Sequence, residues 1–252
     1  MSRTRGGRAT PEINTSRLQA ILLISVKDAT SEVSISASDS DQPFLITFSI
    51  RQKWSANPTQ PLTISTWRTP LDTSPELKFG GGSVRRHLRM LSITEPRRSL
   101  SVGPLPRHLR IHWADPYPAD NWRDLMGFVT IPSYASGEEL LVTRTLERED
   151  LFSKTWAGTY NIPRPGEEFE LGLDSDFYVE WWNWGDLEGD LKDKKFVVLP
   201  NPKYSDRDDP PPPDPYLLPY ACWDDFEDDE GREMIYLQID QSEETKRVKF
   251  VD

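Results

Sequence analysis

The chain has 252 residues, of which 36% are hydrophobic and 11% aromatic, with 22 prolines and 28% charged residues. This apolar content is sufficient for one large or two small folded domains with polar connections. The single cysteine, Cys222, excludes an intramolecular disulfide and a cysteine-based zinc site. No stretch has the pattern of a signal peptide or reaches about 18 consecutive apolar residues, so we expect a cytosolic or nuclear protein without a membrane span.

The charge is distributed unevenly along the chain, whose formal net charge is −11. Residues up to Leu125 include 17 Lys and Arg against 11 Asp and Glu, whereas residues from Met126 onward include 13 against 30. Nucleic-acid binding requires clustered cations for phosphate contacts, so the overall acidity argues against it. This polarity indicates either self-complementary halves or a protein partner attracted to one pole.

The N-terminal third has the pattern of a β protein. Residues 1–15 place arginines among small polar residues and are predicted to form a disordered basic lead. The apolar run 18–26 is compatible with a buried strand or a short helix. Alternating or β-branched segments follow at 33–36, 44–50 and 62–67. Their regular spacing predicts an all-β fold with little helix, either a β-sandwich or a barrel.

The segment Ser65–Asp72 reads Ser-Thr-Trp-Arg-Thr-Pro-Leu-Asp. A strand that runs into T-x-x-T-P-L-D resembles a motif of uncharacterised fungal proteins and of the β-sandwich pro-segments of fungal deuterolysin-type metalloproteases. The resemblance covers residues 17–72 and implies an immunoglobulin-like β-sandwich. The His-Glu-x-x-His zinc motif of those proteases is absent from this chain, so the resemblance implies no catalytic residue.

Two motifs in the middle of the chain have a functional and a structural interpretation. The glycine-rich residues 80–83 precede basic residues but lack the Gly-Lys-Ser/Thr of a phosphate-binding loop, so we predict a flexible connection. Ser99 and Ser101 follow two arginines, as in the substrates of basophilic kinases. They are candidate phosphorylation sites, at which a phosphate would add a strong negative charge beside the arginines.

His108, His112 and Asp115 are the candidate metal ligands of the sequence. On a helix the two histidines would share one face, but prolines crowd this region and residues 109–113 alternate like a strand. In a strand the histidines would lie about 13 Å apart. We therefore predict no metal site and no cofactor.

Further strands are predicted at 126–131, 139–146 and 169–173. The segment 177–199 then concentrates three of the nine tryptophans of the chain. If its first part is one extended strand, that strand has aromatic or apolar bulk on both faces, as expected of a core strand with its cover. The alternative is an aromatic shelf for a sugar ring or a partner's cation, formed by Tyr178, Trp182 and Trp184. The charged, glycine-containing residues after Trp184 and the apolar residues 196–199 predict a hairpin with a long loop.

The C-terminal region changes in composition. Residues 200–232 are rich in proline and acidic residues and are predicted to be an exposed loop or linker. They include a candidate partner-binding cluster that lacks the ordered spacing of an EF-hand: Asp224, Asp225, Glu227, Asp228, Asp229 and Glu230. Strands predicted at 234–239 and 248–251 would return residues 233–252 to a main domain formed by residues 16–199.

The motifs of the common enzyme classes are absent: there is no Gly-x-Ser-x-Gly, no Walker loop and no dinucleotide fingerprint. We therefore predict a non-catalytic protein-interaction module whose acidic C-terminal surface steers a partner. Two alternatives remain. One is a carbohydrate-binding module that uses the aromatic shelf, and the other is a glycan-acting enzyme that uses a pair of carboxylates.

Overall fold

The structure, a computed structural model, describes residues 17–35, 43–66, 69–71, 88–95, 98–101, 127–146, 163–173, 177–179, 181–199, 217–221 and 233–252. These residues form fifteen β-strands and a short 3-10 turn, Tyr134–Ser136. The predicted all-β class is therefore confirmed for the described part of the chain. The predicted basic lead, residues 1–15, lies outside it.

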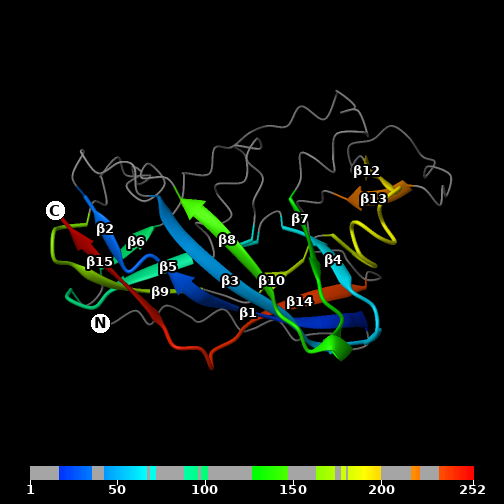
Figure 1. The fold of residues 1–252 in the computed structure, drawn as a ribbon, viewed down its shortest axis with the longest axis horizontal. Helices are drawn as coiled ribbons and strands as arrows, with labels where there is room; N and C mark the ends of the chain where they lie inside the picture. Colours follow the sequence, from blue (N-terminus) through cyan, green and yellow to red (C-terminus); the bar gives the residue numbers. More distant parts are fainter. Residues whose placement is uncertain are drawn as a thin grey trace, which may run out of the picture.

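A five-stranded sheet, here called sheet A, runs along the long axis of the molecule (Figure 1). Its order is β10 (Phe177–Tyr178), β14 (Met234–Ile239), β1 (Leu18–Ala29), β3 (Phe44–Ser55) and β8 (Leu140–Leu146). β1 is parallel to β14 and antiparallel to β3, which in turn is antiparallel to β8. The first apolar run of the chain is thus a strand of 12 residues rather than a helix.

A second five-stranded sheet, sheet B, is built from shorter strands. Its order is β2 (Glu32–Ser34), β15 (Lys246–Val251), β9 (Glu168–Leu173), β5 (Leu88–Ser92) and β6 (Ser99–Ser101). β2 is parallel to β15, and the other neighbours are antiparallel. The C-terminal residues therefore contribute one strand to each large sheet, β14 to sheet A and β15 to sheet B.

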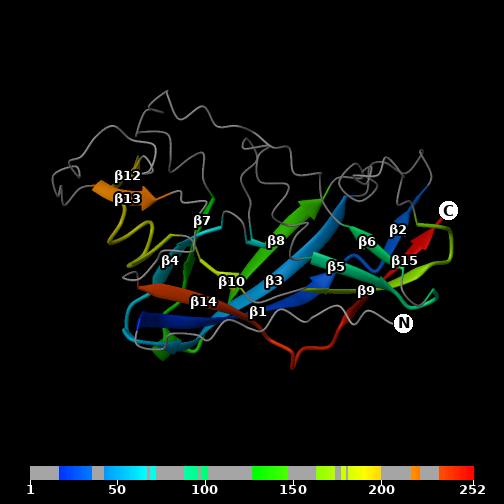
Figure 2. The same cartoon turned by 180° about the vertical axis from the view of Figure 1, so that it is seen from behind.

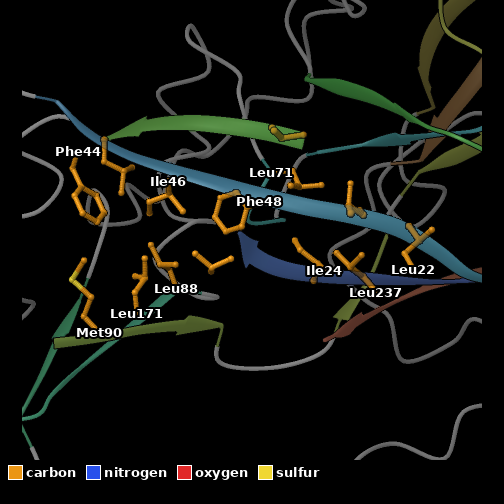
Figure 3. Packing of buried hydrophobic residues seen from close by; sticks show 14 of the residues in the cluster. Leu22, Ile24, Phe44, Ile46, Phe48, Leu71, Leu88, Met90, Leu171 and Leu237 are labelled. Atoms are coloured by element: carbon orange, nitrogen blue, oxygen red, sulfur yellow. The ribbon is translucent and has the colours of Figure 1, made fainter. Parts of the chain in front are cut away.

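Sheets A and B share one hydrophobic core. On β3, the alternate residues Phe44, Ile46 and Phe48 are at most 1% exposed. Their side chains point toward Met90 of β5 and Leu171 of β9, which approach them from sheet B (Figure 3). Because successive residues of a strand point to opposite faces, this burial also determines which residues of β3 and β8 lie on the outer face of sheet A.

A three-stranded sheet, sheet C, lies toward the opposite end of sheet A from sheet B (Figures 1 and 2). Its order is β11 (Trp182–Trp184), β4 (Leu62–Ser65) and β7 (Phe128–Ile131), with antiparallel pairing throughout. Near it, β12 (Lys195–Leu199) and β13 (Leu217–Ala221) form a parallel pair. Within the predicted linker, residues 200–232, the structure describes only β13.

Two predictions about the tryptophan segment are wrong. Residues 177–184 do not form one strand, because β10 pairs with β14 in sheet A whereas β11 pairs with β4 in sheet C. Residues 182–199 do not form a hairpin, because β12 pairs with β13 instead of β11. Both errors have the same cause: each piece of the segment pairs with a strand distant in sequence, and strand preference depends on such neighbours more than on local pattern.

Candidate functional site

The tryptophans of β11 face the protein core. Trp182 and Trp184 lie opposite Ile64 and Leu62 of β4 and on the same side of sheet C. Both aliphatic partners are fully buried, and the two indoles are half-buried against the same hydrophobic cluster. The side of sheet C that carries these tryptophans therefore packs against the core, and Thr63 and Ser65 on the other side of β4 are buried as well.

The contacts of the indole rings are those of aromatic packing. Trp182 and Trp184 meet edge to face, with ring centroids 5.8 Å apart and an interplanar angle of 75°. The indole N–H of Trp182 donates to the carbonyl oxygen of Glu233 at 3.3 Å. Trp181 is 4% exposed, and its ring meets Phe128 edge-on at a centroid distance of 5.3 Å.

The three positions of the predicted aromatic shelf are divided between two sheets. Tyr178 lies on β10, opposite Tyr236 of sheet A, whereas Trp182 and Trp184 lie on β11 in sheet C. The three residues therefore do not share the surface of a single strand, which the shelf interpretation assumed.

A chain of hydroxyl groups joins β4, β7 and the turn after β11. The N–H of Leu187 donates to Oγ1 of Thr130 at 3.1 Å, the hydroxyls of Thr130 and Thr63 are 2.9 Å apart, and Thr63 donates to the carbonyl of Gly185 at 2.8 Å. Because a carbonyl can only accept, Thr63 donates its proton to Gly185, and Thr130 therefore donates its own proton to the Thr63 oxygen. This buried polar chain is complete and serves to hold the turn on sheet C.

A buried ion pair fixes the turn between β5 and β6. Glu167 is 6% exposed, and its Oε2 accepts from Nη2 of Arg98 at 3.0 Å and from the backbone N–H of Arg164 at 2.7 Å. The guanidinium of Arg164 reaches Glu95 at 2.8 Å in a more exposed pair. These contacts tie the start of β9 to the β5–β6 turn.

The remaining predicted site residues fall in different places. Ser99 is exposed, begins β6 and directly follows Arg98, and Ser101 ends the same strand. The candidate metal ligands at positions 108, 112 and 115 and the acidic cluster of residues 224–230 lie outside the described residues. Within the described residues, no group of three or more His, Cys, Asp or Glu is placed to hold a metal ion.

The outer face of sheet A exposes large apolar side chains. Leu45 and Trp54 on β3 are 42% and 43% exposed, and Leu141 on β8 is 54% exposed. Between Leu45 and Leu141 the hydroxyls of Thr47 and Thr143 are 2.9 Å apart across the two strands. On the β3–β8 half of this face, here called the outer strip, Leu45, Leu141, Thr143 and Thr145 are exposed, whereas Thr47 is half-buried and Ser49 is buried.

Charged side chains border this strip at the start of β8. Glu139 accepts a hydrogen bond from the hydroxyl of Ser49 at 2.5 Å and lies 3.6 Å from Nζ of Lys27. The Ser49 hydrogen bond, with help from the charge of Lys27, lowers the pKa of Glu139 below its usual value. Glu139 is thus held as a carboxylate beside the exposed Leu141.

A second carboxylate borders the same face on the β14 side. Asp240 accepts hydrogen bonds from the hydroxyl of Ser242 at 2.6 Å and from its N–H at 3.0 Å. Its Oδ2 also lies 3.1 Å from the guanidinium of Arg51 on β3. The Ser242 hydrogen bonds, followed by the Arg51 contact, lower the pKa of Asp240.

The outer strip was only partly predictable. The alternating pattern at 139–146 predicts a strand, which the structure confirms as Leu140–Leu146, but it does not reveal that this strand lies at the edge of its sheet.

Comparison of the chain with protein-family models, with curated proteins and with solved structures finds no match. Among the described residues, no helix has the length and apolarity that crossing a membrane requires.

Proposed function

We propose that the chain is a non-catalytic protein-interaction module built on an immunoglobulin-like β-sandwich. The order of strand pairing supports the fold. In immunoglobulin domains, strands A, B and E share one sheet, and C′, C, F and G share the other. Here β1, β3 and β8 would correspond to A, B and E, and β6, β5, β9 and β15 to C′, C, F and G.

The three strands of sheet C then have a simple explanation as insertions between framework strands. β4 lies between β3 and β5, β7 between β6 and β8, and β11 between β9 and β15. The three strands of sheet C would therefore come from three separate connections of one sandwich, and sheet C would be an addition at its end. Enlarged loops at the end of a sandwich are a common place for binding functions.

The observation that carries the proposed function is the outer face of sheet A. Leu45 and Leu141 are each more than 40% exposed and lie on neighbouring strands, with the charged Glu139 and Lys27 at one end of the strip. The Thr47–Thr143 pair lies between these leucines, and a surface of exposed apolar and polar side chains bordered by ordered charges is typical of a protein–protein contact. The contrast with Trp182 and Trp184, which pack against the core, favours this face over the tryptophans as the binding surface.

Charge would guide the partner to the module. The net charge is −11, and the excess of acidic residues lies after Met126. A chain with this charge attracts cationic partners over distances of about one Debye length, ~8–10 Å at physiological salt. The acidic cluster of residues 224–230 would contribute to the rate of encounter rather than to the final contact.

The experiment compares surface variants as bait for a partner. The full chain and the double variant Leu45→Glu/Leu141→Glu are immobilised and exposed to a lysate of the cells that contain the protein. The matched control is Ile93→Glu, which introduces a charge at another exposed apolar residue, 40% exposed and away from this face. We expect a protein that the parent and Ile93→Glu retain and the double variant loses.

Recovery of the same proteins by all three baits would contradict the proposed use of this face. If recovery of the partner is the same at low and at high salt, electrostatic steering is contradicted, but the use of this face is not. Circular dichroism and urea unfolding of each bait establish that the substitutions leave the fold intact, as expected for exposed positions.

A further inference from the structure

Among the described residues, three of the four edge strands of the large sheets are short, and one is long. The edge strands β10, β2 and β6 have two, three and three residues, whereas the edge strand β8 has seven. Short edge strands are a common means of preventing unwanted pairing with other chains. β8 also contains no proline and no lysine, and its seven pairs with β3 run without a bulge.

A contact on the far side of β3 shows in which direction the backbone N–H and C=O groups of β8 point. The N–H of Leu45 donates to Oγ1 of Thr30 at 2.9 Å, and its C=O accepts from the N–H of Thr30 at 2.9 Å. Thr30 follows β1, so both polar backbone groups of Leu45 point away from β8. The opposed pair Leu45 and Thr145 is therefore a non-hydrogen-bonded pair of the β3–β8 ladder.

The regular register extends this conclusion along the strand. Hydrogen-bonded and non-hydrogen-bonded pairs alternate in an antiparallel ladder, so Thr143 and Leu141 also direct their N–H and C=O groups away from β3. Within the described part of the chain no strand pairs with that side of β8. β8 thus presents three amide and three carbonyl groups in a row, spaced for another extended backbone.

We propose that β8 binds an extended segment of a partner protein by strand addition, with basic residues of the segment next to the start of β8. Strand addition to an open sheet edge is an established mode of peptide recognition, in which main-chain hydrogen bonds supply affinity. Glu138 and Glu139 are exposed immediately before β8. An antiparallel segment would place its C-terminal end beside these two carboxylates, so lysine or arginine there would complement them.

A second copy of the chain fits this edge less well. Each copy carries a net charge of −11, so association of two copies is opposed by mutual repulsion. The alternate residues of β8 that face the core side are Leu140, Val142, Arg144 and Leu146. If a second β8 paired with this edge with its core-side residues on the same side, the neighbour of Arg144 would be either an apolar residue or the other copy's arginine. Neither neighbour can form an ion pair with Arg144, and two arginines on paired strands repel each other.

This inference depends on the proposed function, and its test separates the edge of β8 from the outer face. The probe is a fluorescein-labelled peptide of five alternating valines and threonines followed by two lysines, and the control peptide ends in two glutamates. Thr143→Pro removes one outward N–H, and proline is tolerated at an edge strand where the N–H faces solvent. Thr143→Val loses the same hydroxyl contact to Thr47 but keeps the N–H.

Fluorescence anisotropy with the full chain should show saturable binding of the lysine peptide and much weaker binding of the glutamate peptide. Thr143→Pro should weaken the binding at least about tenfold, and Thr143→Val should change it by less than about threefold. Failure of the lysine peptide to bind the parent, or equal binding by Thr143→Pro, would overturn the proposal. A concentration-dependent dimer of the peptide-free parent that Thr143→Pro abolishes would instead identify a second copy as the occupant and would also overturn it.

Hydrogen exchange of the parent protein tests the same point without a variant. The amides of Leu141, Thr143 and Thr145 should exchange fast in the free chain and become protected with the lysine peptide, while those of Val142 and Arg144 should be slow in both states. Uniform protection along β8 in the free chain would contradict the open edge. If Leu45→Glu/Leu141→Glu loses a partner that Thr143→Pro retains, strand addition fails while the proposed function stands.

Discussion

Trp182 on β11 donates its indole hydrogen to the carbonyl oxygen of Glu233, the residue that precedes β14, at 3.3 Å. β11 belongs to sheet C and β14 to sheet A, so this side chain ties the two sheets together. Its ring also packs against Trp184 and the shared hydrophobic cluster. The hydrogen bond and the packing can be separated by substitution.

Trp182→Phe keeps an aromatic ring but removes the donor to Glu233, and we expect a loss of about 1 kcal/mol in the free energy of unfolding. Trp182→Ala also removes the packing, for which we expect about 2–4 kcal/mol because the ring is half-buried. The matched control is Trp54→Ala, since Trp54 is 43% exposed and should cost less than about 1 kcal/mol. Urea unfolding measures all three, and similar losses at both tryptophans would contradict the packed position of Trp182.

Gly185 needs a conformation and a space that other residues lack. Its φ is 113°, and a Cβ at this position would lie 2.8 Å from Cβ of Asp190. Gly185→Ala should therefore destabilise the chain by about 2 kcal/mol or more. Gly137 has a φ of 68°, and a Cβ there would meet no atom within 4 Å, so Gly137→Ala should cost only about 1 kcal/mol. Thermal unfolding of the two variants isolates the clash, and equal losses would contradict it.

The strands with a clear local pattern were predictable from sequence. The predicted segments 126–131, 139–146 and 234–239 correspond to Phe128–Ile131, Leu140–Leu146 and Met234–Ile239. Each of them carries a short run of apolar and β-branched residues, alternately buried in β8 but buried at three consecutive positions in β14. Local composition therefore identifies these strands, because each contains the apolar and β-branched residues of a strand within its own sequence.

The strands that were missed depend on distant partners. β5 begins at Leu88, where arginines nearby and a glycine run before it favoured a flexible connection, yet Leu88 and Met90 pack against sheet A. β13 contains Pro219, which normally argues against a strand. The candidate site also depends on distant partners. The alternating pattern of β8 is visible in its own sequence, but its position at the edge of sheet A depends on which other strands lie beside it.

The ion pair between Arg98 and Glu167 should be costly to break from one side. Their side chains are 20% and 8% exposed, so Arg98→Met would leave a buried carboxylate without its charged partner, and we expect a loss of about 3 kcal/mol. The double variant Arg98→Met/Glu167→Leu should recover most of that loss, because replacement of both charges by apolar groups is often neutral.

The exposed pair of Arg164 and Glu95 is the control for this prediction. Their side chains are 67% and 48% exposed, so Arg164→Met should change the free energy of unfolding by less than about 1 kcal/mol. Urea unfolding of the four proteins measures the difference. A double variant as unstable as Arg98→Met would show that the two side chains contribute through packing rather than through their charges.

Acid should destabilise the chain partly through Asp240 and Glu139. The Ser242 hydrogen bonds lower the pKa of Asp240, and the Ser49 hydrogen bond lowers that of Glu139. A carboxyl whose pKa is lower in the folded state than in the unfolded state, about 3.9 for Asp and 4.3 for Glu, favours folding above the unfolded value. This contribution is lost as the pH falls through the folded pKa, so the urea midpoint should be steady near neutral pH and fall below about pH 5.

Ser242→Ala tests the stated cause without changing the charge of the chain. It removes the hydroxyl that is the largest influence on the pKa of Asp240, so it should lower the urea midpoint near pH 7 and have a smaller effect near pH 3, where Asp240 is protonated in the unfolded chain. The two profiles should therefore converge as the pH falls. A constant difference between the parent and Ser242→Ala across this range would mean that the hydroxyl stabilises the turn independently of the charge on Asp240.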